Sequence, residues 1–260
     1  MKIVVSGATG FLGSALRRHW RSGGHEVADT GAYRLGQEVP AGLFEGADVF
    51  VHAAHAFGPN QMQCNIDGAR ALLKHGRDAG IGRCVFLGSL SAHAGARSEY
   101  GATKFAIERS FLDEGFTVVR PGLVAGRGGL FERLAGKLQK RRIAPLVDPY
   151  RRDVAILALT DFLAAVSALV ESNRTGAWNL FAPELLTPAE FTRAVWRGSG
   201  VIVPIPGRIA EMGLAAADAT ALLDSLRGRR YPPVPFPHSD LPALVPRWTP
   251  ALAAVREATQ

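Results

Sequence analysis

Short runs of apolar, β-branched residues alternate along the chain with longer segments whose apolar positions recur at helical spacing. Runs that are apolar at successive positions are typical of strands buried on both faces of a parallel sheet. They cover residues 2–6, 25–28, 48–53, 83–88 and 117–120. The chain therefore predicts a series of strands, each separated from the next by a helix or a loop.

The helical segments end at or near glycine in the first half of the chain. Helices are predicted at residues 14–22, 61–79, 99–114, 130–140, 160–171 and 188–197, with a late strand at 177–180. Strands and helices that alternate with short links require right-handed crossovers, so the predicted fold class is α/β with a doubly wound parallel sheet. After residue 198 proline becomes frequent, and residues 231–237 cannot form a regular helix or a central strand.

Composition narrows the class of protein. With 47% hydrophobic and 20% charged residues, the chain is typical of globular proteins. The net charge of +7 is concentrated in one segment. Residues 127–152 hold eight basic and two acidic residues, and the positive and negative charges of the rest of the chain nearly cancel. Such a local excess indicates a local anionic partner, or else a solvated helix face.

Several classes are excluded at this stage. The chain has no apolar run long enough for a membrane span, and its first residues lack the pattern of a secretory signal. Cys64 and Cys84 form neither a disulfide framework nor a metal-ligand spacing, and no zinc-like cluster is present, so no metal is expected. Two buried thiols and a cytoplasmic location are therefore predicted.

A glycine-rich segment follows the first predicted strand and precedes the first predicted helix. Glycine recurs at every third position, at Gly7, Gly10 and Gly13. These glycines permit a tight turn, close approach of the backbone to a diphosphate and close helix–strand packing. The amide groups and the dipole at the helix N-terminus favour phosphate. In this strand–loop–helix context the spacing predicts a dinucleotide site, although it is not the GxGxxG form.

The type of dinucleotide depends on the residues after the second predicted strand. An acid there binds the ribose hydroxyls of NAD, whereas an arginine accommodates the 2′-phosphate of NADP. Asp29 is the acid near this point, and the arginines that could meet a phosphate are Arg34 and Arg17 or Arg18. The choice between NAD and NADP stays open.

A tyrosine and a lysine, Tyr100 and Lys104, lie four residues apart on one face of the helix predicted at 99–114. An adjacent ammonium group and a positively charged nicotinamide ring would lower the pKa of the phenol. The pair would then exchange the proton of a carbinol while hydride moves to or from a cofactor. Ser89, at the end of the preceding strand, would hydrogen-bond the same oxygen, and Ser91 is the alternative.

Together these motifs resemble the short-chain dehydrogenase/reductase superfamily, in the extended branch of NAD-dependent epimerases and dehydratases. The matching segments run in family order over nearly the whole chain, at residues 7–13, 51–54, 65–68, 85–92, 100–104, 119–122 and 247–250. The resemblance implies one extended unit: an NAD(P)-binding Rossmann core at 1–125 and parts of 150–182, with a small C-terminal substrate-binding subdomain formed by 126–150 and 183–260.

The resemblance also implies roles for individual residues. Tyr100 would be the acid and base, Lys104 would hold the nicotinamide ribose, and Ser89 would polarise the substrate oxygen. Asn65 matches a position that serves either a structural hydrogen bond or a proton relay, while His52, His55 and His93 are interpreted as structural. The cofactor, NAD or NADP, would contact Gly7, Thr9, Gly10, Phe11, Leu12, Gly13, His52, Ala53, Ala54, Tyr100, Lys104 and Pro121.

The predicted function is that of an NAD(P)-dependent oxidoreductase or epimerase acting at a carbinol or ketone carbon of a nucleotide-linked sugar. Dehydratases of this branch carry an Asp-Glu pair where Leu90 and Ser91 follow Ser89 here, so elimination chemistry is disfavoured. The chain is also shorter than typical nucleotide-sugar epimerases. The alternative is a catalytically silent NAD(P)-binding regulator or assembly factor on the same fold.

The basic segment fits this interpretation, because it follows the strand beside the predicted nicotinamide site. The bases that would bind the phosphates of a substrate are Arg127, Arg133, Lys137, Arg141 and Arg142. The expected partner is thus an anionic small molecule, without nucleic acid or membrane. Family members often dimerise through two long helices, which correspond here to residues 61–79 and 99–114, so a homodimer is possible.

Overall fold

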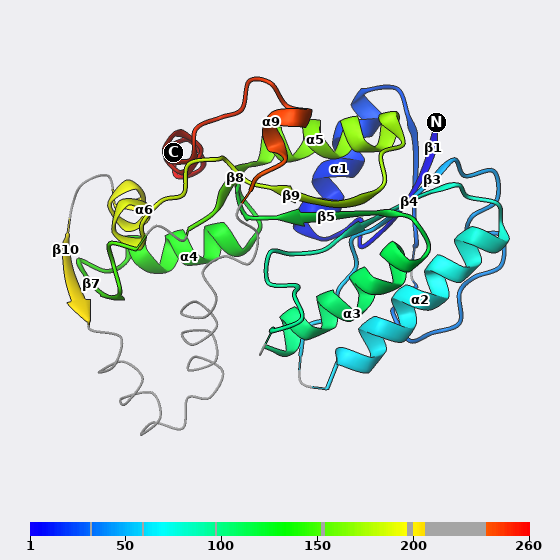
Figure 1. Cartoon of the computed structure of the whole chain (residues 1–260), viewed down its shortest axis with the longest axis horizontal. Coiled ribbons are helices and arrows are strands. Elements are labelled where there is room, and N and C mark those ends of the chain that lie inside the picture. Colours follow the sequence, from blue (N-terminus) through cyan, green and yellow to red (C-terminus); the bar gives the residue numbers. More distant parts are fainter. Residues whose placement is uncertain (32, 59, 97, 152–153, 197–199, 206–237) are drawn as a thin grey trace. The chain divides into compact units, whose positions relative to one another are not determined.

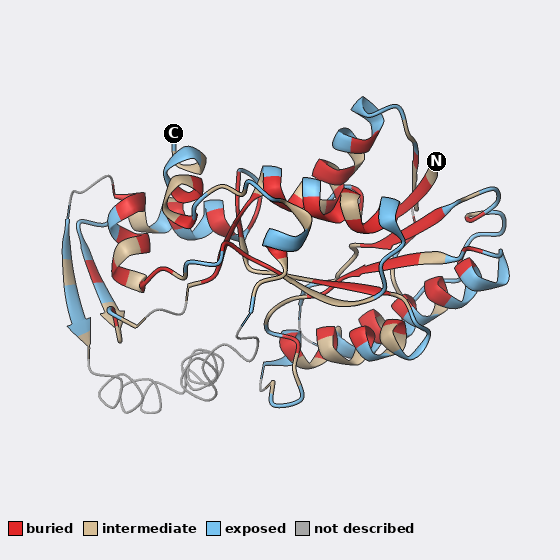
Figure 2. Ribbon diagram, turned by 45° about the horizontal axis from the view of Figure 1, so that its top comes forward, coloured by how far each residue is buried: buried red, intermediate tan, exposed pale blue. Residues whose placement is uncertain are grey.

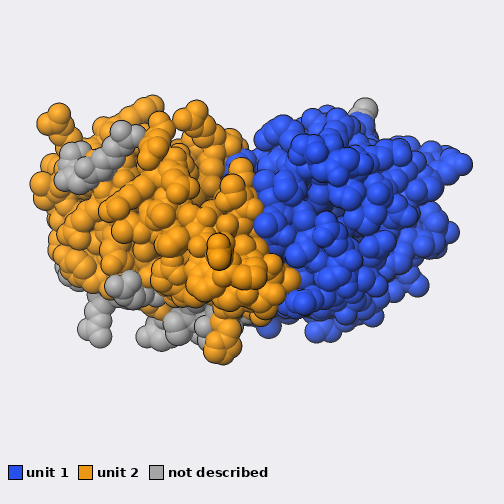
Figure 3. All heavy atoms as spheres, turned by 90° about the horizontal axis from the view of Figure 1, so that it is seen from above, with its two compact units in different colours: residues 1–120, 163–178 blue, residues 121–162, 179–260 orange. Residues whose placement is uncertain are grey.

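The computed structural model describes residues 1–31, 33–58, 60–96, 98–151, 154–196, 200–205 and 238–260. The chain forms two compact units, coloured separately in Figure 3: Met1–Arg120 with Leu163–Trp178, and Pro121–Phe162 with Asn179–Gln260. Three sequence-based predictions lie outside the described residues: the basic side chain of Arg152, the end of the helix predicted at 188–197, and the irregular segment 231–237.

The predicted strands form one six-stranded sheet. Its order is β2 (Glu26–Asp29), β1 (Lys2–Ser6), β3 (Val49–His52), β4 (Arg83–Leu87), β5 (Thr117–Pro121), β9 (Gly176–Leu180). β1 pairs with β2 and β3, β3 with β4, and β4 with β5, all in parallel. The strand order reverses at β1, and sheets of this kind bind ligands outside the carboxyl ends of the strands at that point. The predicted doubly wound α/β fold is confirmed.

Helices cover both faces of this sheet. α1 (Phe11–Ser22) and α5 (Leu159–Ser172) lie on one face, and α2 (Met62–Asp78) and α3 (Glu99–Asp113) lie on the other (Figure 1). On the first face, the indole Nε1 of α1 Trp20 donates a hydrogen bond of 2.8 Å to an α5 serine hydroxyl, at position 167. This bond satisfies the one polar atom of a tryptophan that is otherwise buried.

The core of the second face is built from residues of both helices and the central strands. It includes Phe50 on β3, Phe86 on β4, Leu72 on α2, and Ile107 and Phe111 on α3. All five side chains are almost completely excluded from solvent, and Figure 2 shows the buried strands between the half-exposed helices. Strands that are buried on both faces explain why their sequences are apolar at successive positions.

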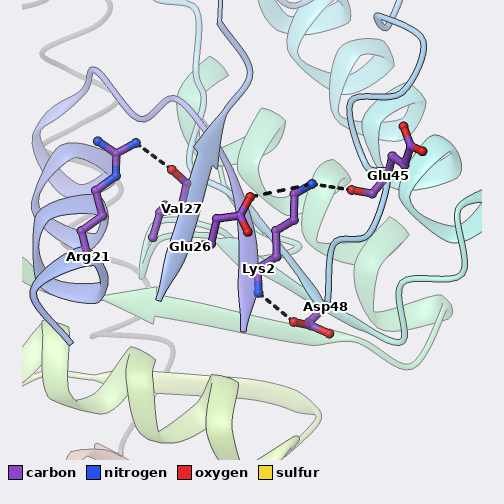
Figure 4. Close-up of polar contacts among 6 residues, drawn as sticks. All are labelled: Lys2, Arg21, Glu26, Val27, Glu45 and Asp48. Carbon is purple, nitrogen blue, oxygen red and sulfur yellow. Dashed lines mark hydrogen bonds and ion pairs between the residues drawn. The ribbon is translucent and has the colours of Figure 1, made fainter. Parts of the chain in front are cut away.

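Polar contacts fix the amino ends of the first three strands (Figure 4). The amide of Lys2 donates to Asp48 Oδ2 at 2.7 Å. Its ammonium group donates to Glu45 O at 2.6 Å and lies 3.9 Å from Glu26 Oε1. Arg21, at the end of α1, donates to the carbonyl of Val27. These contacts lie at the opposite end of β1 from the glycine loop, so they hold the sheet without occupying the ligand-binding edge.

The second unit contains four strands that the sequence did not indicate. β6 (Leu123–Ala125) pairs in parallel with β8 (Ile156–Ala158), and β7 (Ile143–Val147) pairs in parallel with β10 (Val201–Ile205). β10 lies at the start of the proline-rich part of the chain that follows residue 198. Both β7 and β10 contain a proline, which is tolerated because a two-stranded sheet consists of edge strands only.

Helices pack around the strands of this unit. They are α4 (Leu130–Gln139), α6 (Pro188–Val195), α9 (Leu241–Leu244) and α10 (Ala251–Ala258). Phe131 and Phe191 meet edge to face at the centre of the shared core. The family-like segment 247–250 leads into α10, and its Thr249 amide donates to Asp161 at 2.6 Å. Sequence analysis missed α9 and α10, which are short.

The two cysteines have different surroundings. Cys84 is buried on β4, and burial raises the pKa of its thiol to about 12. Cys64 is only half-buried on α2, and its thiol donates to Leu35 O at 3.0 Å. The prediction of two buried thiols is therefore wrong for Cys64.

Candidate active site

The glycine loop forms a tight cradle between β1 and α1. Gly7 has a φ of +70°, and a Cβ at this position would lie 2.6 Å from Ala54 N. A Cβ on Gly13 would overlap the carbonyl oxygen of Gly7. The N-cap of α1 is Gly10, so no side chain caps the first amides, and the first turn contains no acid. These open amides and the helix dipole fit the diphosphate of a dinucleotide.

A larger residue in this cradle is expected to prevent both packing and binding. Gly13→Ala should destabilise the protein by about 1–3 kcal/mol and lower its affinity for NAD(P) at least about tenfold, because the new methyl group overlaps Gly7 O. Urea unfolding and cofactor titration measure the two effects. Gly136→Ala on α4 is the matched control, since nothing lies within 4 Å of its Cβ. Cofactor affinity equal to wild type in Gly13→Ala would contradict the cradle.

The end of β3 lies against this cradle. Ser6 Oγ and His52 Nδ1 are 2.7 Å apart, and both residues are fully buried. Burial, with the charges of Lys104 and His55, lowers the pKa of His52 to about 3, so the ring is neutral at physiological pH. Ala53 and Ala54 then bring the backbone directly against Gly7. The structure thus places the predicted segment 52–54 beside the glycine loop.

The end of β2 carries the residues predicted to choose the dinucleotide. Asp29 Oδ2 accepts a hydrogen bond of 2.9 Å from Arg17 Nη1, and Asp29 Oδ1 accepts one of 2.8 Å from the Gly31 amide. Arg34 is exposed in the following loop and donates to Tyr33 O. An acid and two arginines therefore lie at this strand end, and Arg17 balances the charge of the acid.

Ser89, Tyr100 and Lys104 come together beyond the end of β4. The Ser89 hydroxyl lies beside the phenol of Tyr100, whose pKa it lowers, and it accepts a hydrogen bond of 3.1 Å from the Ser91 amide. Lys104 Nζ donates to Leu87 O at 2.8 Å and lies 6.0 Å from the centre of the Tyr100 ring. Ser89, rather than the exposed Ser91, is therefore the serine whose side chain meets the tyrosine.

The protonation of this group follows from burial. Burial of the hydroxyl raises the pKa of Tyr100, and the hydrogen bond with Ser89 lowers it by a smaller amount. Burial alone lowers the pKa of Lys104 to about 7. The raised pKa of Tyr100 is opposite to the direction expected from Lys104 and a nicotinamide ring. The hydrogen bond of the lysine ammonium group goes to Leu87 O.

Asn65 fixes the loop that follows β3. Its Oδ1 accepts the Ala56 amide at 2.8 Å, and its Nδ2 donates to Ala56 O at 2.9 Å and to Gln61 O at 2.8 Å. The side chain is 1% exposed. Of the two roles considered for this residue, the structure shows the hydrogen bonds to the backbone.

The second unit carries the predicted phosphate-binding bases. Arg127, Arg133, Lys137, Arg141 and Arg142 are all exposed, on α4 and the segments beside it. Within the described part of the chain none of the five makes an ion pair. Their charges are thus available to a ligand. Pro121, predicted to lie beside the nicotinamide, is half-buried at the end of β5.

Two further properties concern the described residues as a group. No cluster of three His, Cys, Asp or Glu side chains among them is arranged to hold a metal ion. None of the helices formed by these residues has both the length and the apolar character needed to cross a bilayer.

Known proteins are similar to this chain in part of its sequence and in its fold. The chain matches no protein-family model. Among curated proteins it is similar to uncharacterised proteins of Mycobacterium tuberculosis and Mycobacterium bovis, 35% identical over 104 residues. The match covers 34% of this chain and 12% of the length of each relative.

Solved structures match over more of the chain. The structure named gox2253 has a TM-score of 0.80 at 16% identity, covering 98% of this chain and 96% of that one. Human epimerase family protein SDR39U1 with NADPH has a TM-score of 0.68 at 18% identity, covering 100% of this chain and 99% of that one. The UDP-glucose 4-epimerase of Thermus thermophilus with NAD has a TM-score of 0.61 at 21% identity, covering 79% of this chain and 86% of that one. The chain therefore has a Rossmann-type fold like that of these solved structures, as its motifs predict.

Proposed function

We propose that the chain is an NAD(P)-dependent oxidoreductase or epimerase that transfers hydride at a carbinol or ketone carbon of a nucleotide-linked sugar. The observation that carries the proposal is the presence, in one unit, of the glycine cradle and of Ser89, Tyr100 and Lys104 close together. Both lie at carboxyl ends of strands in the same sheet, where α/β proteins bind ligands. Proteins of this fold solved with NAD and NADPH support the cofactor class.

Each residue has a defined task in this proposal. When bound, the dinucleotide supplies the acceptor or donor of hydride. The amides of the loop and of α1 bind its diphosphate, and Lys104 binds the nicotinamide ribose. Tyr100 gives or takes the proton of the carbinol oxygen, and Ser89 holds that oxygen by a hydrogen bond. The same residues serve a reductase and an epimerase.

The test begins with the cofactor. Extraction of the purified protein, followed by titration with NAD and NADPH, identifies the dinucleotide and its affinity. NAD that stays bound through purification identifies an epimerase, and a requirement for added NADPH identifies a reductase. A panel of UDP-, GDP- and dTDP-linked sugars should then raise the thermal midpoint by about 5 °C or more at saturation. Absence of both cofactor binding and any shift would overturn the proposal.

The exposed bases of the second unit are proposed to bind the phosphates of the substrate. Removing two of them with Arg141→Ala and Arg142→Ala should raise KM about tenfold, because charge-assisted bonds to phosphate are lost. Cofactor affinity should stay at the wild-type value. Arg70→Ala with Arg109→Ala removes the same charge from α2 and α3 and is the matched control. Equal KM values in the two double variants would assign the bases to a solvated helix face.

A further inference from the structure

One aromatic side chain of the first unit is far more exposed than others of its kind. Phe57, in the loop after β3, is 78% exposed. Its ring is nearly parallel to that of Tyr100, at 10° and 6.4 Å between centroids. His55 meets both rings edge to face, 4.8 Å from Phe57 and 5.0 Å from Tyr100. These three residues form a ring cluster around the proposed acid and base.

The ring cluster is held by the backbone. Ala56 stands between the two loop residues, and Asn65 binds both its amide and its carbonyl from the buried side. The backbone of the loop is therefore held at Ala56, the residue between His55 and Phe57. The phenyl ring of Phe57 leaves its apolar surface in water, so the arrangement favours a ligand that covers it.

His55 supports the same arrangement. Burial, with the charge of Lys104, lowers the pKa of His55 to about 4, so the ring is neutral and packs as an aromatic residue at physiological pH. Its Nδ1 is buried and has no hydrogen-bond partner among the described residues. The ring thus serves as a spacer between Phe57 and Tyr100.

We propose that Phe57 is the platform for the sugar ring of the substrate, and that His55 is a positioning residue that sets Phe57 beside Tyr100. The apolar C–H face of a pyranose covers the exposed phenyl ring, and the carbinol at its rim then lies next to the phenol. A ligand pocket typically combines such an aromatic surface with a few polar groups, here Ser89 and Tyr100. The inference rests on the proposed function and adds the residue that recognises the sugar.

Binding of UDP-glucose and of UDP alone tests the platform. Phe57→Ala should weaken binding of UDP-glucose about tenfold and leave the affinities for UDP and NAD(P) unchanged. Phe57→Trp should bind UDP-glucose within about twofold of wild type. Its added indole fluorescence should shift to the blue with UDP-glucose but not with UDP. Met62→Ala removes another exposed apolar side chain of the first unit, on α2, and is the control.

The role of His55 has a separate readout. His55→Ala should raise KM for the sugar substrate, and His55→Phe should restore it, because only the ring packing is needed. If wild type binds UDP-glucose and Phe57→Ala binds it equally well, the platform is wrong while the proposed function stands. Wild type that binds neither NAD(P) nor any nucleotide-linked sugar of the panel overturns both. Equal weakening of UDP and UDP-glucose in Phe57→Ala overturns the platform alone.

Discussion

Tyr100→Phe is expected to lower kcat by about 10²–10⁴-fold, because it removes the group that exchanges a proton with the substrate oxygen. The substitution keeps the aromatic ring and therefore the contacts with His55 and Phe57. Cofactor affinity and the thermal midpoint should stay close to wild type. Steady-state kinetics with the best substrate of the panel, together with cofactor titration, separate loss of proton transfer from loss of binding.

Two sets of control variants test whether the loss of activity is specific to Tyr100 and its neighbour Ser89. Tyr33→Phe removes a buried phenol whose oxygen has no hydrogen-bond partner among the described residues, and it should leave kcat unchanged. Ser89→Ala should lower kcat more than Ser91→Ala does, because only the Ser89 side chain meets Tyr100. Turnover at the wild-type rate in Tyr100→Phe would refute the assignment. A wild-type protein that binds NAD(P) but turns over no substrate would point to the regulator or assembly factor.

The first unit was predictable because its central strands β1, β3 and β4 are buried on both faces. These strands are apolar at most positions, and the helices between the strands end at glycines such as Gly80 and Gly115, whose positive φ values terminate a helix. The glycine loop was predictable for a different reason: only glycine fits where two backbone segments are in contact. These features are local, so one stretch of sequence contains them.

The second unit was less predictable because its strands depend on their partners. β6 and β8 have three residues each, too few to show a period. β7 and β10 each contain a proline, which disfavours a central strand but is tolerated in the two edge strands that they form. The strands that pair with each other are distant in the chain, so no local sequence pattern indicates the pairing.

The surroundings of the site were also missed for lack of a local pattern. Phe57 lies in a loop, and its contact with Tyr100 joins residues 43 positions apart. A signal did exist on α3, where Tyr100, Lys104 and Glu108 follow one another at intervals of four and share a helix face. An acid at the third position of such a row indicates a partner beneath the helix.

That partner is Arg120 on β5. Arg120 Nε donates to Glu108 Oε2 at 2.9 Å, and Arg120 Nη2 donates to Glu108 Oε1, so the pair is bidentate. Glu108 is 1% exposed and the Arg120 side chain 13%. Both charges are thus removed from water and depend on each other. The pair ties the helix that carries Tyr100 and Lys104 to the sheet that carries Ser89.

Glu108→Ala is therefore expected to lower the free energy of unfolding by about 3–5 kcal/mol, because it leaves the buried guanidinium without its carboxylate. Asp113→Ala removes an exposed ion pair with Arg109 from the same helix and should change it by only about 0.5 kcal/mol. The double change Glu108→Leu with Arg120→Met should recover most of the loss, since no buried charge remains. Urea unfolding of the four proteins measures the series, and similar losses in Glu108→Ala and Asp113→Ala would show that the pair does not join α3 to the sheet.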